Sequence, residues 1–246
     1  MDSYIKPTKL QITMKGLKIR KWIILSSVLG PILFFVFSTL AMLLYSGGNG
    51  LDPEMEGYSF LYNFFSDLGL WTSFAEVSNA TASILFGVGL TIVGLSLIPY
   101  YIYMPIFTPT KKSSRFWFSI GSLIGIVASI AYVGIAFTPW DLRLSTHMWF
   151  VYIAFPLSLP MAICYVIGFL SDGERFPKRL TFYYVVYILI LTIYLYLLFF
   201  GPNTETEMGR LIQVVGQKII VYTTLITMVL EGLGIAKIPN NLKEKE

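Results

Sequence analysis

The sequence predicts an all-α membrane protein, a bundle of six transmembrane helices with a short interfacial helix or re-entrant segment in its first outer loop. Three observations predict this fold: an apolar composition, six apolar segments of membrane-spanning length, and basic residues concentrated in alternate connections. Of the 246 residues, 55% are hydrophobic and 13% are charged, whereas soluble domains average about 25% charged residues. A water-soluble fold of this length would expose too much apolar surface, so the bilayer is the expected solvent.

Six apolar segments are long enough to cross about 30 Å of hydrocarbon at about 1.5 Å per residue. They are 22–45, 77–103, 116–138, 147–170, 180–200 and 211–236. Basic residues precede the first segment, but its apolar run is too long for a signal peptide and no clear cleavage site follows it. We therefore expect a basic N-terminal arm over 1–21, a transmembrane domain over 22–236 and a C-terminal tail over 237–246.

The basic residues predict an orientation. Of the 18 Lys and Arg residues, all except Arg143, Arg210 and Lys218 fall before the first segment, after the second and fourth, or after the last. By the positive-inside rule that side is cytoplasmic. The sequence thus predicts a multi-pass protein of the cell membrane with both termini in the cytoplasm.

Two glycines predict close helix packing. Gly121 and Gly125 give the third segment a GxxxG spacing, and small residues allow neighbouring helices to approach closely in a membrane.

The scarcity of metal-ligating side chains excludes several chemistries. The chain has one cysteine, Cys164, and one histidine, His147. An intrachain disulfide, a Cys/His zinc site and a multi-histidine metal centre are therefore excluded. We expect no metal, no cofactor and no nucleic-acid partner.

The first outer loop, 46–76, is acidic and aromatic. It has no Lys or Arg, and its acidic residues are Asp52, Glu54, Glu56, Asp67 and Glu76. Its second half, from Tyr58 to Trp71, carries aromatic rings among scattered polar groups. Such a segment is typical of a short helix at the membrane interface.

Polar residues in the last segment form a stripe. Gln213, Gln217, Thr224 and Glu231 lie within roughly 40° of one another on a helical projection. The stripe should face the interior of the bundle, because unpaired polar groups in lipid cost several kcal/mol. Lys218 lies off the stripe and too deep to reach water easily, so we expect an acidic partner for it. Glu231 is either a buried group or a solvated charge near the helix end.

Other polar residues fall at the same depth. Glu76 and Asn79 stand at the start of the second segment, and Asp141, Arg143 and His147 lie in the turn before the fourth. One hypothesis is a polar pocket on the outer side, and the other is that these groups only cap helices and fasten the loop. The ligand-binding candidates are Ser66, Asp67, Glu76, Asn79, Asp141, Arg143, His147, Gln213, Gln217 and Lys218.

A family resemblance follows from two motifs. Asn63-Phe-Phe-Ser-Asp-Leu-Gly69 is followed by Asn79, and Thr138-Pro-Trp-Asp141 is followed by His147. This order resembles the prokaryotic membrane family known as domain of unknown function 998, which is distantly similar to membrane proteins of the damage-regulated autophagy modulator type. The resemblance runs from about the first to the fifth segment and implies six helices and a loose association with membrane lipids. The matching positions are Ser66, Asp67, Gly69, Asn79, Pro139, Asp141 and His147, and the acidic Glu76 departs from the pattern.

Three functions remain open. The favoured hypothesis is a non-enzymatic protein whose outer pocket binds a lipid headgroup, zwitterionic or amine-bearing, or a membrane partner such as a second copy of the chain. The first alternative is a transporter of small solutes or lipids that uses the helix stripe, which requires a continuous polar cavity from Gln213 to Glu231. The second is an intramembrane hydrolase with His147 as base, Asp67 or Asp141 orienting it, and Ser66 as nucleophile. No catalytic residue is assigned.

Overall fold

Six long helices and one short helix form the described part of the chain. The computed structural model describes residues 9–107 and 109–238. The helices are α1 (Lys9–Leu43), α2 (Ala80–Phe107), α3 (Lys112–Ala136), α4 (Trp140–Ser171), α5 (Lys178–Phe200) and α6 (Glu207–Ala236), and the short 3-10 helix is η1 (Phe65–Gly69). All six long helices contain a stretch long and apolar enough to span a membrane. The predicted fold class, including the short helix in the first long loop, is confirmed.

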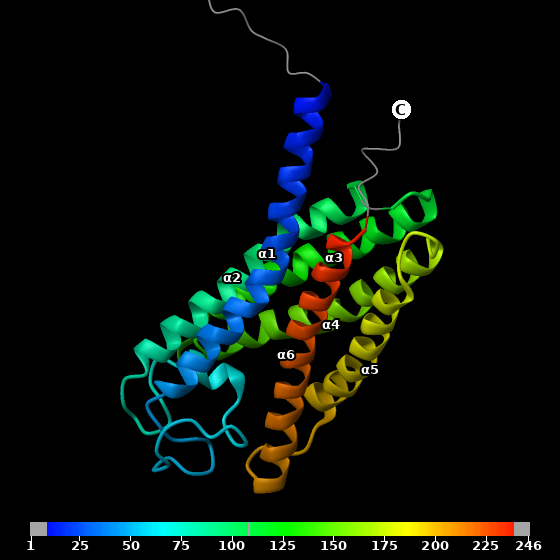
Figure 1. The fold of residues 1–246 in the computed structure, drawn as a ribbon. Coiled ribbons are helices and arrows are strands. Elements are labelled where there is room, and N and C mark those ends of the chain that lie inside the picture. The colour runs from blue at the N-terminus through cyan, green and yellow to red at the C-terminus, as the bar shows by residue number, and fades with distance from the viewer. Residues whose placement is uncertain (1–8, 108, 239–246) are drawn as a thin grey trace, which may run out of the picture.

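The long helices pack in a ring. Each contacts its neighbours in chain order, and α6 closes the ring by packing on α1. Figure 1 shows the start of α1 and the end of α6 at one end of the bundle, which we call the termini end. Residues 44–79 lie at the opposite end, which we call the loop end.

Several helix ends differ from the prediction. α2 begins at Ala80 instead of 77, because Asn79 is held in the loop by hydrogen bonds to other loop residues. α4 begins at Trp140 instead of 147, directly after Pro139, with a break at Arg143, whose φ of −144° is not helical. α6 begins at Glu207 instead of 211, because the Thr206 hydroxyl caps it by accepting a hydrogen bond from the Gly209 amide.

The chain ends are described in part. α1 already begins at Lys9, so much of the predicted arm over 1–21 is helical. The remainder of that arm, 1–8, and most of the predicted tail, 239–246, lie outside the described residues.

The predicted glycine seam on α3 is present. A Cβ added to Gly121 would lie 2.8 Å from the Tyr165 ring of α4, and one added to Gly125 would lie 2.7 Å from the Tyr101 ring of α2. These distances are too short for a methyl group. The two glycines therefore let α3 lie close to both of its neighbours.

The two halves of the bundle are packed differently. The half towards the termini end is filled with aromatic rings, where Phe118 lies 5.1 Å from both Tyr165 and Phe169 between ring centres. In the half towards the loop end the helices enclose a cavity instead. This difference puts the candidate site beneath the long loop.

Candidate functional site

The long loop is attached to α6 through four side chains. The Phe65 amide donates to Gln217 Oε1 at 2.7 Å, and Arg210 Nε donates to the Tyr62 carbonyl at 2.6 Å. Lys218 Nζ donates to the Asn63 carbonyl, and the Tyr62 hydroxyl donates to Glu207 at 3.0 Å. Each contact uses a backbone group or hydroxyl of the loop, so α6 fixes the path of the loop at η1.

Two further helices hold the other side of the loop. Asn79, directly before α2, donates from Nδ2 to the carbonyls of Leu68 and Leu70, at 3.3 and 2.9 Å. Asp141 on α4 accepts from the amides of Trp71 and Thr72, at 3.0 and 2.9 Å. Asn79 and Asp141 thus fasten the loop, as the second sequence hypothesis proposed for the polar groups.

Asp67 lies at the centre of the attachment. It is 1% exposed, and its Oδ2 accepts from the Phe64 amide at 2.8 Å and from Asn63 Nδ2 at 3.3 Å. Arg210 Nη2 forms an ion pair with the same oxygen at 3.6 Å. Burial raises the pKa of Asp67 to about 6, although Arg210 and the two hydrogen bonds oppose the rise.

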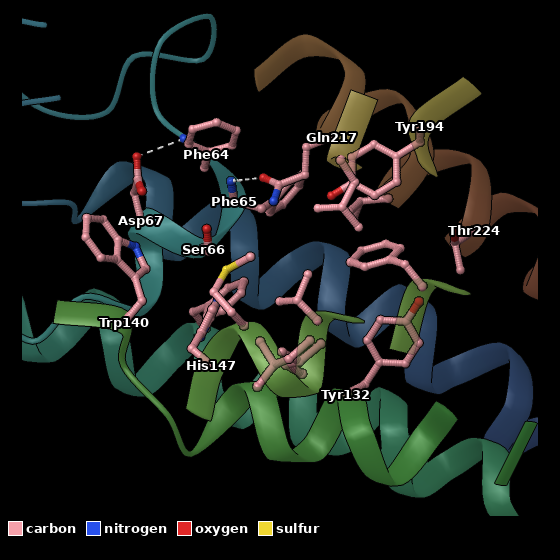
Figure 2. Close-up of a pocket in the computed structure, with 18 of the residues that line it drawn as sticks. Phe64, Phe65, Ser66, Asp67, Tyr132, Trp140, His147, Tyr194, Gln217 and Thr224 are labelled. Atoms are coloured by element: carbon pink, nitrogen blue, oxygen red, sulfur yellow. Dashed lines mark hydrogen bonds between the residues drawn. The ribbon is translucent and has the colours of Figure 1, made fainter. Parts of the chain in front are cut away.

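Beneath the loop lies a cavity of about 590 Å³. All six long helices and the loop contribute to its walls, and Figure 2 shows the loop residues Phe64, Ser66 and Asp67 at one end and Tyr132 and Thr224 at the other. The deep part is lined mainly by apolar side chains from α2 to α6. The polar lining near the loop comprises Ser66, Asp67, His147, Thr204, Arg210, Gln213 and Gln217. The cavity is therefore amphipathic, with an apolar interior and a polar mouth at the loop end.

His147 lines this cavity. The residue is 5% exposed, and its Nδ1 lies 2.7 Å from the Thr138 carbonyl oxygen. A carbonyl only accepts hydrogen bonds, so Nδ1 carries a proton. In the neutral ring Nε2 is then a hydrogen-bond acceptor, and it is the nitrogen free to meet a ligand.

The hydrolase hypothesis required a carboxylate to orient His147. In the structure the Thr138 carbonyl takes that place, whereas Asp67 and Asp141 bond loop groups and Arg210. Within residues 9–107 and 109–238 no group of three His, Cys, Asp or Glu residues is arranged to hold a metal ion. The geometry gives hydrolysis no specific support.

The polar stripe of α6 divides into two parts. Gln213, Gln217 and Thr224 line the cavity, as the prediction of an inward-facing stripe requires. Glu231 is buried, at 4% exposed, but does not line the cavity. The large cavity therefore does not extend to Glu231, although the transporter hypothesis required one continuous cavity to that residue.

Asp67 lies near enough to Lys218 to act on it electrostatically, but the two side chains form no direct ion pair. Among the described residues no carboxylate oxygen lies within 4.0 Å of Lys218 Nζ. The ammonium group is 5.2 Å from the Tyr58 ring centre, 5.0 Å from Phe60 and 5.8 Å from Phe65. Ring faces carry negative partial charge, so together with the Asn63 carbonyl they take the place of a carboxylate.

Two candidate residues lie away from the cavity. Glu76 is exposed in a turn with a φ of +58°, and Arg143 is exposed at the break in α4. Neither lines the cavity. Of the ten candidates, the structure brings five into the cavity wall: Ser66, Asp67, His147, Gln213 and Gln217.

Sequence reasoning missed two residues of the site. Arg210 pairs with Asp67 and lines the cavity mouth, and Asn63 bonds Asp67 while its carbonyl accepts from Lys218. Arg210 precedes Gln213 by three positions, so it continues the α6 stripe once the helix is known to begin at Glu207. Asn63 lies in an irregular segment, where no periodicity could have placed it.

No protein-family model, curated protein or solved structure matches this chain. The resemblance to the domain of unknown function 998 family therefore stays a prediction.

Proposed function

We propose that this membrane protein binds a lipid in the cavity beneath the loop, with the apolar chain inside and the headgroup at the polar mouth. The observation that carries the proposal is the amphipathic lining of one cavity of about 590 Å³. This volume falls in the range of about 300–1,000 Å³ that is typical of small-molecule sites.

The cavity walls favour an apolar occupant over a polar solute. Leu90, Val93, Ile135, Val151 and Leu225 line the interior from four different helices. A sugar or amino acid placed there would lose its hydrogen bonds to water without gaining equivalent partners, which costs several kcal/mol per group. An acyl or isoprenoid chain has no such groups to satisfy.

The mouth favours a headgroup with a phosphate or carboxylate. Arg210 supplies positive charge to the mouth. Two charged side chains interact with it, the acidic Asp67 and the basic Lys218, so Asp67 alone does not cancel the positive charge of this group. Ser66 adds a hydroxyl, and Gln217 lines the mouth while its side chain also bonds the Phe65 amide and Tyr194. Donors of this kind suit the oxygens of an anionic group.

The basic residues support a specific placement in the cell membrane. The connections 107–112 and 171–178 lie at the termini end and carry Lys111, Lys112 and Arg175. By the positive-inside rule the termini end faces the cytoplasm and the cavity mouth faces outward.

The proposal is tested by filling the cavity. Val221 lines it from α6, whereas Ile219, two positions away, is 50% exposed on the outer face of the same helix. We expect native mass spectrometry to show a co-purified lipid on the wild type and on Ile219→Phe, and to show loss of that lipid from Val221→Phe. Both variants should match the wild type in gel filtration. Retention of the same lipid at the same stoichiometry by a folded Val221→Phe variant would overturn the proposal.

A further inference from the structure

Glu231 is a buried carboxyl in the half of the bundle towards the termini end. The Tyr184 hydroxyl of α5 donates to its Oε2, and its Oε1 has no hydrogen-bond partner among the described residues. The cavity proposed for lipid does not use this residue.

The groups that face Glu231 are hydroxyls, not cations. Tyr100 and Tyr101 approach from α2, Tyr165 from α4 and Tyr184 from α5. On α1, Arg20 donates to the carbonyls of Ile235 and Ile238, beyond Glu231 along α6. The described elements around the carboxyl therefore provide no positive charge in contact with it.

An ionised carboxylate in this setting is strongly disfavoured. Removing an ion from water costs several kcal/mol even after the protein relaxes, and an opposite charge is the usual compensation. Glu231 meets the hydroxyls of Tyr184 and Tyr100, but its Oε1 has no hydrogen-bond partner by geometry and no cation of the described residues balances the charge. Protonation removes the charge, so a neutral carboxylic acid fits the site.

A second, small cavity shares part of its lining with the large one. Its volume is about 20 Å³, enough for one water molecule, which needs about 10–15 Å³. It shares Tyr132 and Thr224 with the large cavity, and Tyr184 lines it as well. Its remaining hydroxyl-bearing residues are Tyr101, Ser129, Ser158, Tyr187 and Thr227. The Tyr132 hydroxyl is itself buried with no hydrogen-bond partner among the described residues.

We propose that Glu231 is an intramembrane proton-binding site that exchanges its proton with the large cavity through Tyr184 and the small cavity. In loading, a hydronium ion in the small cavity gives a proton to the Tyr184 oxygen while Tyr184 passes its own proton to the Glu231 carboxylate. The products are water and a neutral carboxylic acid, and unloading is the reverse. A ligand in the large cavity would block this route, so ligand occupancy and proton exchange are linked.

The first measurement is the infrared C=O band of protonated carboxyl groups in protein reconstituted at neutral pH. We expect a band in the wild type and in Asp67→Asn, and its loss in Glu231→Gln. An unchanged band in Glu231→Gln would show that Glu231 is ionised and would overturn the proposal.

The second measurement follows the shift of that band after transfer to D₂O. Tyr184→Phe should slow the shift by roughly a hundredfold, the lower range for a positioned proton donor. The matched control is Tyr196→Phe on the same helix, where Tyr196 is 64% exposed. Val221→Phe, which fills the large cavity, should slow the shift too. Exchange at the wild-type rate in Tyr184→Phe would overturn the relay.

The proton site at Glu231 can be tested separately from lipid binding. Glu231 does not line the large cavity, so Glu231→Gln should retain the co-purified lipid in native mass spectrometry. Loss of lipid from this variant would overturn the separation of the two sites.

Discussion

At the scale of single residues, Asp67 shows how burial and pairing compete. Its carboxyl is removed from water, while Arg210 and two hydrogen-bond donors favour the ionised form. Burial dominates, since the pKa rises from 3.8 to about 6. The ion pair with Arg210 is thus a way to hold the loop in one place more than a source of stability.

The pH dependence of stability follows from this shift. Between about pH 4 and pH 6 the folded protein binds the Asp67 proton more tightly than the unfolded chain, so the free energy of unfolding falls as pH rises. The raised pKa corresponds to roughly 3 kcal/mol that is present at acid pH and lost above about pH 6. We expect thermal unfolding in detergent to show this decline in the wild type and not in Asp67→Asn.

Comparing the wild type with Asp67→Asn at each pH removes the contribution of other titrating groups to the free energy of unfolding. Asp172, after α4, acts in the opposite direction: burial raises its pKa, but hydrogen bonds from Thr110 and Lys111 lower it overall. Its contribution is present in both proteins and cancels. Equal pH profiles for the wild type and Asp67→Asn would contradict the assignment.

At the scale of elements, α6 organises the site. Four of its side chains bond the loop, and Gln213, Gln217 and Thr224 of its polar stripe line the cavity, with Gln217 doing both, because the helix lies between the loop and the cavity. Lys218 shows the consequence for a single side chain. It points to the loop, where three rings and a carbonyl surround it, while Gln217 beside it faces the cavity mouth.

The seam along α3 is a second element-scale feature, and it predicts a packing defect. A methyl group on Gly125 would lie 2.7 Å from the Tyr101 ring, and overpacking of this kind costs about 1–3 kcal/mol. We expect Gly125→Ala to lower the midpoint of thermal unfolding in detergent. Leu123→Ala serves as the control, because Leu123 is 66% exposed on the same helix. The seam would lose its support if both substitutions had the same effect.

At the scale of the whole molecule, the ring of helices is closed at one end by aromatic packing and opened at the other into a cavity. Contacts between α1 and α6 bring the first and last helices together, so both ends of the described chain lie at the termini end. The loop then covers the opposite end and carries the polar groups of the mouth. The cavity and the loop that covers it therefore lie at the same end of the bundle.

This arrangement predicts which connections share a side of the membrane. In a Cys164→Ala background we expect Ser113→Cys and Glu174→Cys to react with impermeant maleimide only after cells are permeabilised. Glu54→Cys and Glu205→Cys should react in intact cells, since they lie at the loop end. All four replaced residues are exposed. Labelling of Glu54→Cys and Glu174→Cys from the same side would contradict the topology, and exchange of the two patterns would contradict the orientation.

The sequence by itself determined the six helices, the short helix in the long loop and the end of the bundle where polar groups gather. Bilayer thickness and hydropathy act on each segment separately, so these features can be predicted without knowing any contact. The inward direction of Gln213, Gln217 and Thr224 also followed from helical periodicity alone. Helix starts at Trp140 and Glu207 did not, because they depend on local capping and on a break at Arg143.

Only the tertiary structure decided which polar residues meet. Arg210, not Lys218, pairs with Asp67, and the Thr138 carbonyl, not a carboxylate, orients His147. Glu76 and Arg143 have the right depth but face away from the cavity. These outcomes depend on how the helices diverge towards the loop end and on the irregular path of the loop. Neither has a periodic signature in one sequence, because both arise from contacts between segments far apart in the chain.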